Sequence, residues 1–453
     1  MTALAEQIET AETMSCLGLT GRVASVTGMT VEAAGLPLPV GSVCEICAPG
    51  RGVMAEVIGF RGSVTLLMAL SEPRGLAKGQ PVRSITDSRK IAVGPGMLGR
   101  VFDGMGNACD GGPPITFETR YPLDRSAPKA VGRSLIDTPL SVGIRSINAL
   151  ITPGRGGRLG VFAGTGVGKS VLLGMMSRHT SADVAVIALV GERGREVGDF
   201  ISKELGKDGL KRSVVVASTS DQSPLLRVRA GLVATTIAEY FRDRGADVLL
   251  MMDSVTRLAM AGRQIGLAAG EPPATKGYPP SVFAMLPKLL ERSGRTDRGS
   301  ITGLYTVLVE GDDTNDPIAD AVRGILDGHV WLSRRIASRG QYPAVSVLES
   351  ISRLMPDVVD ADQMEAAQKV RRMLSTWAEI EDLVNIGAYA PGSNPDFDLV
   401  IEMRPAIEEF LRQGMREEVD FESSRSELMD LSKRIDEASN RLKKRASQRS
   451  DDA

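Results

Sequence analysis

A glycine-rich stretch at residues 163–170 carries the residue types that bind a nucleoside triphosphate. It reads Ala-Gly-Thr-Gly-Val-Gly-Lys-Ser. The glycines let backbone N–H groups approach phosphate oxygens, Lys169 supplies a positive charge, and the hydroxyl of Ser170 is a ligand for Mg²⁺. We therefore predict that ATP and Mg²⁺ bind here, with contacts from eight consecutive residues: Gly164, Thr165, Gly166, Val167, Gly168, Lys169, Ser170 and Val171.

The segments on either side of this stretch fit that interpretation. The apolar run 159–162 is typical of a buried strand and the run 171–176 of a helix, whose N-terminus would face the phosphates. One position departs from the strict P-loop pattern, because Ala163 stands where the pattern has glycine. The alternative is a chance glycine-rich turn, but such a turn rarely places Gly-Lys-Ser between a strand and a helix.

Two carboxylates follow apolar runs and could complete a hydrolytic site. Asp253 closes the run 248–252, so its carboxylate would emerge at the carboxyl end of a strand and hold Mg²⁺ near Ser170 through water. Glu192 closes another run and could orient and deprotonate an attacking water. Each has a structural alternative, because Asp253 could cap the next helix and the Glu192 loop could be a plain charged turn.

Composition limits the class of protein. A chain of 453 residues exceeds a single core, so two or three domains are expected. A formal net charge of −2 gives no global attraction to nucleic acid or membrane. Without a basic leader or an 18-residue apolar run, we expect a cytoplasmic protein. Cys44 and Cys47 form a lone CxxC beside only two histidines, so reduced thiols are favoured over a zinc site.

Four regions are expected in this α/β chain. Residues 1–16 are predicted to be a flexible segment, and residues 17–93 contain short β-type runs that indicate a small barrel or sandwich. In residues 94–355 a glycine- and proline-rich connection leads into apolar strands alternating with amphipathic helices, which predicts a mainly parallel sheet covered by helices. Residues 356–453 carry helical patterns.

Two segments invite closer interpretation. The stretch 266–280 is too rich in glycine and proline for regular structure, and so long a loop is usually functional, with a plain connector as the alternative. Near the C-terminus, apolar residues recur at alternating spacings of three and four, which predicts a helix packed on its own domain rather than an independent coiled coil. These residues are Leu428, Leu431, Ile435, Ala438 and Leu442.

The order of these motifs resembles the catalytic subunit of rotary ATP synthases and their hexameric relatives over nearly the whole chain. The P-loop is followed by Gly-Glu-Arg at 191–193, Asp-Ser-Val-Thr-Arg at 253–257, Tyr-Pro-Ala-Val at 342–345 and Ser-Ile-Ser-Arg at 350–353. The P-loop, the 191–197 loop and Lys-Gly-Tyr-Pro-Pro-Ser-Val-Phe at 276–283 are most similar to the type III protein-export ATPases. The flagellar member fits better than the injectisome one. The resemblance implies a β-barrel, a RecA-like P-loop NTPase domain and a helical C-terminal domain.

The resemblance also implies roles for individual residues. Lys169 and Ser170 would hold phosphates and Mg²⁺, and Glu192 would activate water. Asp253 would be the Walker B carboxylate. Two arginines, Arg193 and Arg257, would lie near the γ-phosphate.

Three further residues match positions outside these loops. Arg353 matches the arginine finger that reaches a neighbouring subunit's nucleotide, which would make activity depend on assembly. Tyr342 matches the aromatic that stacks on adenine, and Tyr389 is a weaker candidate for a second adenine contact. Ser346 departs from the family, which favours Asp, Asn or His there.

The predicted function is therefore Mg²⁺-dependent ATP hydrolysis by a homohexameric ring that energises flagellar protein export. The alternatives are an injectisome ATPase, a catalytic beta-type subunit of an ATP synthase, a nucleotide-binding subunit with little hydrolysis, which Glu192 argues against, and an RNA-translocating ring. With 4% aromatic residues the chain lacks the stacking surface for RNA, so no nucleic-acid partner is expected.

The resemblance implies protein partners as well. These are other copies of the chain, a stator-like regulator at the N-terminus, a central stalk protein facing the 266–280 loop in the ring channel, an export gate and substrate–chaperone complexes. Peripheral association with the cytoplasmic face of the inner membrane would follow. A lipid role for the first sixteen residues is not expected, because Glu6, Glu9 and Glu12 make them negative.

Overall fold

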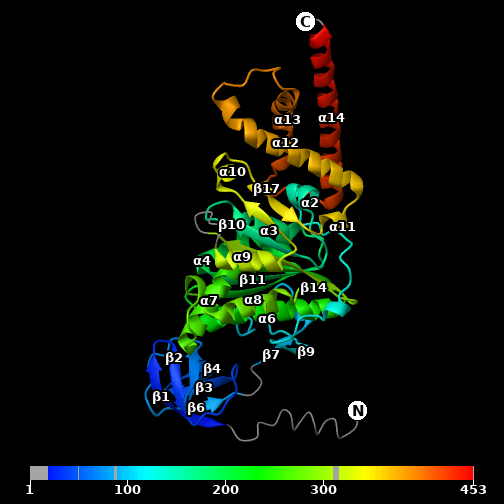
Figure 1. The fold of residues 1–453 in the computed structure, drawn as a ribbon. Helices are drawn as coiled ribbons and strands as arrows, with labels where there is room; N and C mark the ends of the chain where they lie inside the picture. Colours follow the sequence, from blue (N-terminus) through cyan, green and yellow to red (C-terminus); the bar gives the residue numbers. More distant parts are fainter. Residues whose placement is uncertain (1–18, 49, 86–88, 310–315, 452–453) are drawn as a thin grey trace.

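A computed structural model describes residues 19–48, 50–85, 89–309 and 316–451. Three regions follow one another along the molecule: a small barrel, a central sheet flanked by helices, and a helical end (Figure 1). This order confirms the predicted fold class. The segment 1–16, with the predictions made for it, lies outside the described residues.

The N-terminal region is a closed barrel rather than a sandwich. Its six strands pair in the order β1-β2-β5-β4-β3-β6. Side chains alternate between the inside and the outside of the barrel along each strand. In β2, for example, Val31 and Ala33 are fully buried, whereas Glu32 between them is not. The strands are β1 (Thr20–Thr27), β2 (Thr30–Ala34), β3 (Val43–Ala48), β4 (Arg51–Arg61), β5 (Val64–Ala69) and β6 (Pro81–Ser84).

The predicted barrel boundary at residue 93 lies too far along the chain. Strand β7 (Lys90–Val93) pairs with β9 (Thr119–Pro122) in a separate two-stranded sheet, so the barrel ends with β6. The pairing joins segments more than twenty residues apart, which local strand patterns do not reveal. Between them, β8 (Val101–Phe102) runs parallel to β12 at the edge of the central sheet. Short 3-10 turns, η1 (Pro95–Met97) and η2 (Ala130–Gly132), complete this connection.

The central sheet has the strand order β17-β16-β10-β15-β13-β11-β12-β8, with β14 paired to β15. All neighbours on this path are parallel except β17, which is antiparallel to β16. The sequence therefore predicts most of the sheet correctly. The bounds are β10 (Arg158–Ala163), β11 (Val184–Glu192), β12 (Ser213–Thr219), β13 (Asp247–Asp253), β14 (Gly294–Arg295), β15 (Ser300–Leu308), β16 (Gly328–Leu332) and β17 (Val345–Ser352).

Helices cover both faces of this sheet. Alternate residues of β11 enter different cores: Ile187 and Leu189 pack with α3, whereas Val186 and Ala188 pack with α6 and α7. The sheet is thus buried on both sides, as its apolar strands predict. The helices are α2 (Arg145–Leu150), α3 (Lys169–His179), α4 (Gly194–Asp199), the π-helical turn η3 (Phe200–Leu205), α5 (Gly206–Lys211), α6 (Pro224–Asp243), α7 (Val255–Ala269), α8 (Pro280–Leu290), α9 (Pro317–Ile325) and α10 (Arg334–Ser338).

The stretch 266–280 is more regular than its composition suggests. Residues 266–269 form the last turn of α7, which Gly270 ends in a left-handed conformation at φ 92°. A 3-10 turn, η4 (Thr275–Gly277), follows before α8. The helix and the chain that returns after it approach closely at Gly266. A Cβ at this position would lie 2.7 Å from Pro279 Cγ, so the position favours glycine although it is inside a helix. The prediction of a fully irregular loop was wrong for these two turns.

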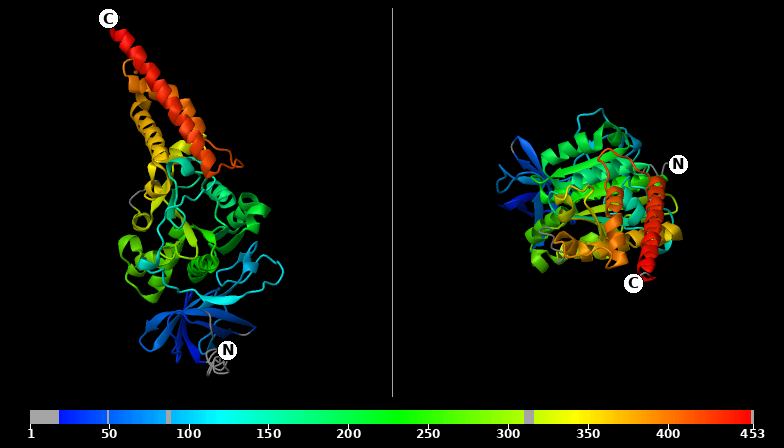
Figure 2. Two further views of the ribbon diagram at one scale, coloured as in Figure 1. Left: turned by 90° about the vertical axis from the view of Figure 1, so that its right-hand side faces the viewer. Right: turned by 90° about the horizontal axis from the view of Figure 1, so that it is seen from above.

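The C-terminal region is helical, and its long last helix packs on its own domain as predicted. Leu428, Leu431, Ile435 and Ala438 of α14 are buried against other helices of the same chain. In Figure 2, α14 runs away from the barrel and carries the C-terminus outward. The elements are α11 (Met355–Val358), α12 (Ala361–Asn385), α13 (Pro395–Leu411) and α14 (Phe421–Asp451).

A buried ion pair fixes α6 to the end of α8. Arg292 donates to both oxygens of Glu239 at 2.9 and 2.8 Å, and to the carbonyl of Leu123 at 2.7 Å. We expect Glu239→Ala to lower the free energy of unfolding by about 3–5 kcal/mol, because the Arg292 guanidinium would stay buried without its carboxylate. Denaturant titration measures this, with the exposed Glu379→Ala as control. Equal midpoints for both variants would contradict it.

Candidate active site at the P-loop

The P-loop connects β10 to α3 at the carboxyl edge of the sheet. Gly166 and Gly168 have φ values of 78° and 84°, a region that side-chain-bearing residues rarely adopt. Val167 is buried and anchors the loop, whereas Gly166 and Ser170 are exposed to an incoming ligand. Ala163 is the buried last residue of β10, where a strand conformation does not require glycine. The departure at Ala163 is therefore compatible with the loop.

Two carboxylates converge on the P-loop lysine. Lys169 Nζ forms an ion pair with Asp253 Oδ1 and lies 3.6 Å from Glu192 Oε1. Asp253 also accepts a hydrogen bond from Thr306 Oγ1 at 2.7 Å. Because β11 and β13 are parallel neighbours, their carboxyl ends bring Glu192 and Asp253 together at one edge. The structure thus places three of the predicted site residues in one cluster.

The donor set of this cluster suits Mg²⁺ together with a triphosphate. Magnesium prefers oxygen ligands and is usually held by one or two carboxylates plus substrate phosphates. The exposed hydroxyl of Ser170 follows Lys169 directly, and the Asp253 carboxylate pairs with that lysine. The residues present therefore fit the metal that the sequence predicts.

Glu192 is nearly buried and lies among charges of both signs. Its Oε2 lies 2.8 Å from Arg257 Nη1, and Arg257 also donates to the carbonyl of Gly191. Burial raises the pKa of Glu192 to about 7, a hydrogen bond with Glu196 and the charge of Asp253 add to this, and Lys169 and Arg257 oppose it. A carboxylate with a pKa near the working pH has the property required of a general base.

Tyr342 lies over the end of the P-loop. Its ring carbons lie 3.4 Å from the position that a Cβ on Gly168 would occupy, and its side chain is partly exposed. The Tyr342 carbonyl accepts from the backbone N–H of Gln413, which follows α13. Met415, which is exposed, lies in the same connection. Its backbone carbonyl accepts a hydrogen bond from the Arg178 guanidinium of α3 at 3.0 Å. The connection 412–420 therefore lies beside Tyr342 and the C-terminal end of α3. The sequence does not predict this, because Tyr342 and Gln413 are about seventy residues apart in the chain.

Two predicted residues are not brought to the cluster. Arg193 points outward with 79% of its side chain exposed and pairs with Glu196 at 3.3 Å. Tyr389 lies in the connection between α12 and α13, where its hydroxyl contacts Asn394 O and Asp398 Oδ1. In Figure 1 this connection lies in the helical end of the molecule, above β10. The described contacts of Tyr389 therefore give it a structural role within its own loop.

Arg353 lies at the opposite edge of the sheet from the P-loop of the same chain. Antiparallel pairing sets Ser352 of β17 beside Gly328 of β16, and Gly328 beside Leu159 at the start of β10. The P-loop follows the other end of β10, about 13 Å further along at 3.3 Å per residue. Arg353 is exposed, so its guanidinium is available to another molecule rather than to its own P-loop.

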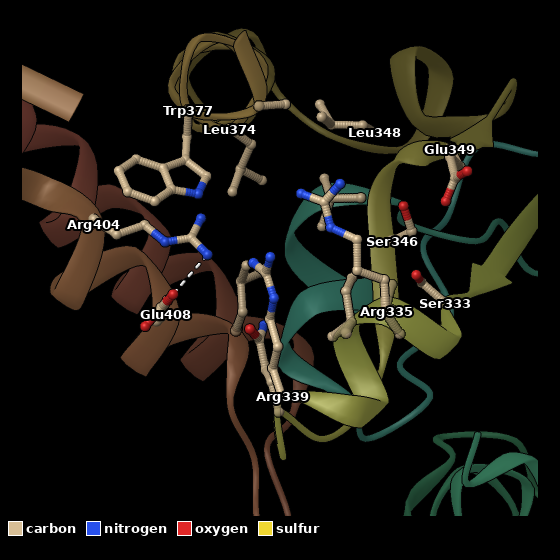
Figure 3. Close-up of a pocket in the computed structure, with 16 residues that line it drawn as sticks. Ser333, Arg335, Arg339, Ser346, Leu348, Glu349, Leu374, Trp377, Arg404 and Glu408 are labelled. Carbon is tan, nitrogen blue, oxygen red and sulfur yellow. Dashed lines mark ion pairs between the residues drawn. The ribbon is translucent and has the colours of Figure 1, made fainter. Parts of the chain in front are cut away.

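A separate cavity of about 350 Å³ lies between α10, β17, α12 and α13 (Figure 3). Arg404 stacks over Trp377 with 4.7 Å to the ring centroid and pairs with Glu408 at 2.6 Å. Ser346, the residue that departs from the family pattern, lines this cavity and not the P-loop. None of the predicted catalytic residues lines it.

Sequence models of known families match all three regions. The beta-barrel domain of the ATP synthase alpha/beta family matches residues 21–85, and the nucleotide-binding domain of that family matches residues 143–352. The T3SS EscN ATPase C-terminal domain matches residues 359–430. Fold and site thus define an ATPase of the ATP synthase alpha/beta class.

Relatives of known name narrow this class. The chain is 53% identical to the flagellum-specific ATP synthase of Pseudomonas aeruginosa, covering 91% of this chain and 92% of the relative. It is 50% identical to the type 3 secretion system ATPase of Xanthomonas euvesicatoria, covering 87% and 89%. The chain therefore belongs to the family of type III export ATPases, and it is a nucleotide-binding ATPase.

A solved structure has the same architecture. The assembled ATPase EscN of the enteropathogenic E. coli type III secretion system superimposes with a TM-score of 0.87 at 41% identity, covering 91% of this chain and all of that one. EscN in complex with its central stalk EscO gives a TM-score of 0.85. In the part of the chain that the structure describes, no helix has the length and apolar character needed to cross a bilayer.

Proposed function

We propose that this chain hydrolyses ATP with Mg²⁺ at sites shared between adjacent copies of a homohexameric ring and thereby energises export of flagellar proteins. The observation that carries the shared site is the position of Arg353 at the sheet edge opposite its own P-loop. A head-to-tail contact that brings this arginine to a neighbour's P-loop must repeat, and it closes into a ring or continues as a filament.

Each residue of the cluster has one task in this mechanism. The P-loop backbone and Lys169 hold the phosphates, and Ser170 and Asp253 would hold Mg²⁺, which supplies positive charge to the γ-phosphate. Glu192 orients a water and accepts its proton. Arg257 holds Glu192 in place, and Arg353 of the next copy neutralises charge that develops on the γ-phosphate.

Two observations favour export over ATP synthesis. The C-terminal region matches the domain of a type III secretion ATPase, and flagellar relatives are among the most similar proteins. The direct test uses the purified chain alone. ATP hydrolysis and ring assembly without a second type of subunit are expected, as is restored motility in a bacterium that lacks its own flagellar export ATPase. Restored injectisome secretion without motility would favour the alternative system.

The proposed partners follow from the same family. The complex of EscN with its central stalk supports a stalk protein in the ring channel, which α7 and the turn after it would face. We further propose a stator-like regulator at the N-terminus, an export gate and substrate–chaperone complexes, at the cytoplasmic face of the inner membrane. No nucleic acid partner is proposed.

Tyr342 is proposed to stack on the adenine base. Removing the ring in Tyr342→Ala is expected to raise KM for ATP roughly 10-fold with a smaller effect on kcat, because base–aromatic stacking contributes about 1–3 kcal/mol. Steady-state kinetics measure this. Tyr342→Phe keeps the ring and serves as the control, and Tyr389→Ala should leave KM unchanged. A large KM effect for Tyr389→Ala and none for Tyr342→Ala would exchange the two roles.

A further inference from the structure

Thr306 is a fully buried hydroxyl residue beside the cluster around Lys169. It lies on β15, the strand between β10, which leads into the P-loop, and β13, which ends in Asp253. In the ladder between β13 and β15, Met252 pairs with Tyr305. The next residues of the two strands, Asp253 and Thr306, therefore lie side by side at the carboxyl edge of the sheet.

The Thr306 hydroxyl donates to the Asp253 carboxylate. Thr306 Oγ1 lies 2.7 Å from Asp253 Oδ1 and 3.3 Å from the carbonyl oxygen of Met252. A hydroxyl carries one proton, and the shorter contact, which is to a charged acceptor, is the stronger hydrogen bond. Thr306 has no exposed surface and Asp253 only 3%, so bulk water has little access to this bond. Thr306 therefore fixes one oxygen of the Asp253 carboxylate.

Lys169 contacts the same carboxylate oxygen, but its contact is of a different kind. Lys169 Nζ pairs with Asp253 Oδ1, whereas a P-loop lysine contacts the β- and γ-phosphates of a bound nucleotide. The lysine side chain is long and flexible, and it can turn from the carboxylate to the phosphates. The branched Thr306 side chain is stiff and lies on a strand with partners on both sides. Thr306 thus keeps its contact with Asp253 when Lys169 turns away.

We propose that Thr306 is a positioning residue that orients the Asp253 carboxylate for Mg²⁺ and thereby couples metal binding to nucleotide binding. The inference rests on the proposed role of Asp253 in holding the metal. A group that hydrogen-bonds a metal ligand fixes the orientation of that ligand, and its loss typically weakens metal affinity about 10- to 100-fold. Thr306 contacts Asp253 and not the substrate, so its effect passes through that carboxylate.

The same strand supplies a matched control for a purely structural hydrogen bond. Thr302 lies four residues earlier on β15 and is 1% exposed, and its Oγ1 accepts from the backbone N–H of Gly156 at 2.8 Å. Thr306→Val and Thr302→Val each remove one buried threonine hydroxyl and keep the shape of the side chain. Both variants should lose stability, because each leaves a buried polar group without its partner. Only Thr306→Val changes a contact of Asp253.

The test compares nucleotide binding with and without metal. A non-hydrolysable ATP analogue is titrated into the full chain in excess Mg²⁺ and again in EDTA, and the ratio of the two affinities measures the coupling of metal to nucleotide. Thr306→Val should lower this ratio roughly 10-fold or more, with binding in EDTA changed less than about 3-fold. Thr306→Ser keeps the hydroxyl and should restore the ratio to within about 3-fold of wild type.

A spectroscopic measurement makes the result independent of turnover. Mn²⁺ accepts the same oxygen ligands as Mg²⁺, and the EPR signal of free Mn²⁺ reports how much metal the complex with the analogue has bound. Thr306→Val should bind Mn²⁺ more weakly by the same factor as in the titration, whereas Thr302→Val should bind it as wild type does. An equal loss in both variants would assign Thr306 a structural role and overturn the proposal.

Two further serine and cysteine results keep the inference testable. A Thr306→Ser variant that behaves like Thr306→Val would overturn it, because the hydroxyl is then not the group that matters. If Thr306→Val does not fold, Thr306→Cys places a weak donor of similar size at this position. Its ratio should lie below that of wild type, and a wild-type ratio would overturn the proposal.

Asp253→Asn separates failure of this inference from failure of the proposed function. If Asp253→Asn keeps the wild-type ratio, the role of Asp253 itself fails. If Asp253→Asn loses the coupling and Thr306→Val does not, only the inference fails. The double variant should lose no more than Asp253→Asn alone, because Thr306 acts through Asp253. Losses that add would also overturn the inference.

Discussion

Arg353→Ala is expected to lower kcat by about 10³- to 10⁵-fold while the chain still binds nucleotide, the range for loss of an arginine finger. The reason is geometric: Arg353 lies at the edge of the sheet remote from its own P-loop, and we propose that it serves the P-loop of another copy. Single-turnover hydrolysis and equilibrium binding of a fluorescent nucleotide measure the two quantities. The exposed Arg372→Ala on α12 is the control and should remain active.

Mixing two inactive variants provides the decisive form of this experiment. A chain with Arg353→Ala keeps its P-loop, and a chain with Lys169→Ala keeps its arginine. In random rings made from equal amounts, about one quarter of the contacts would join an intact P-loop to an intact arginine. Activity should therefore reappear on mixing and increase with total protein concentration. No recovery, or a specific activity independent of concentration in the unmodified protein, would rule out a shared site.

Lys169→Ala is expected to have the second largest effect. We expect kcat to fall on the order of 10²- to 10³-fold and nucleotide binding to weaken, because the substitution removes a preorganised positive charge from the phosphates. In the structure Lys169 is also the cation between two buried carboxylates, Asp253 and Glu192. Its removal leaves these like charges facing one another. The variant should therefore unfold at lower denaturant concentration as well.

Lys169→Met is the matched variant, since it keeps most of the apolar stem and removes only the charge. It should show the same kinetic loss as Lys169→Ala. Steady-state kinetics and denaturant titration of both variants separate the contribution of charge from that of packing. Normal turnover in either variant would contradict the assignment of the P-loop.

The sequence predicts best what is encoded locally. The P-loop needs only consecutive residues, and Asp253 and Glu192 each end an apolar run, so parallel strands bring them to one edge without further information. The barrel and the last helix are likewise visible as periodic patterns. Contacts between distant segments are different. Nothing in the residues around Gln413 indicates that it lies beside Tyr342, and β7 pairs with β9 across more than twenty residues.

Two of the roles that the family resemblance implies, those of Tyr389 and Arg193, stay predictions, because the contacts of these residues in the structure do not bring them to the cluster around Lys169. Tyr389 has the residue type of an adenine contact, but Asn394 and Asp398 hold its hydroxyl in the connection between α12 and α13. Arg193 adjoins Glu192 in sequence, yet strand alternation directs neighbouring side chains apart, and Arg193 reaches solvent.

Because β17 is antiparallel to β16, Arg353 lies away from its own P-loop, and this position has a consequence for inheritance. A copy that lacks both Lys169 and Arg353 would disable the nucleotide site it carries and also the one it serves next door. A cell that makes such a copy beside the normal one should lose far more motility than halved gene dosage explains, so alleles of this kind should behave as dominant.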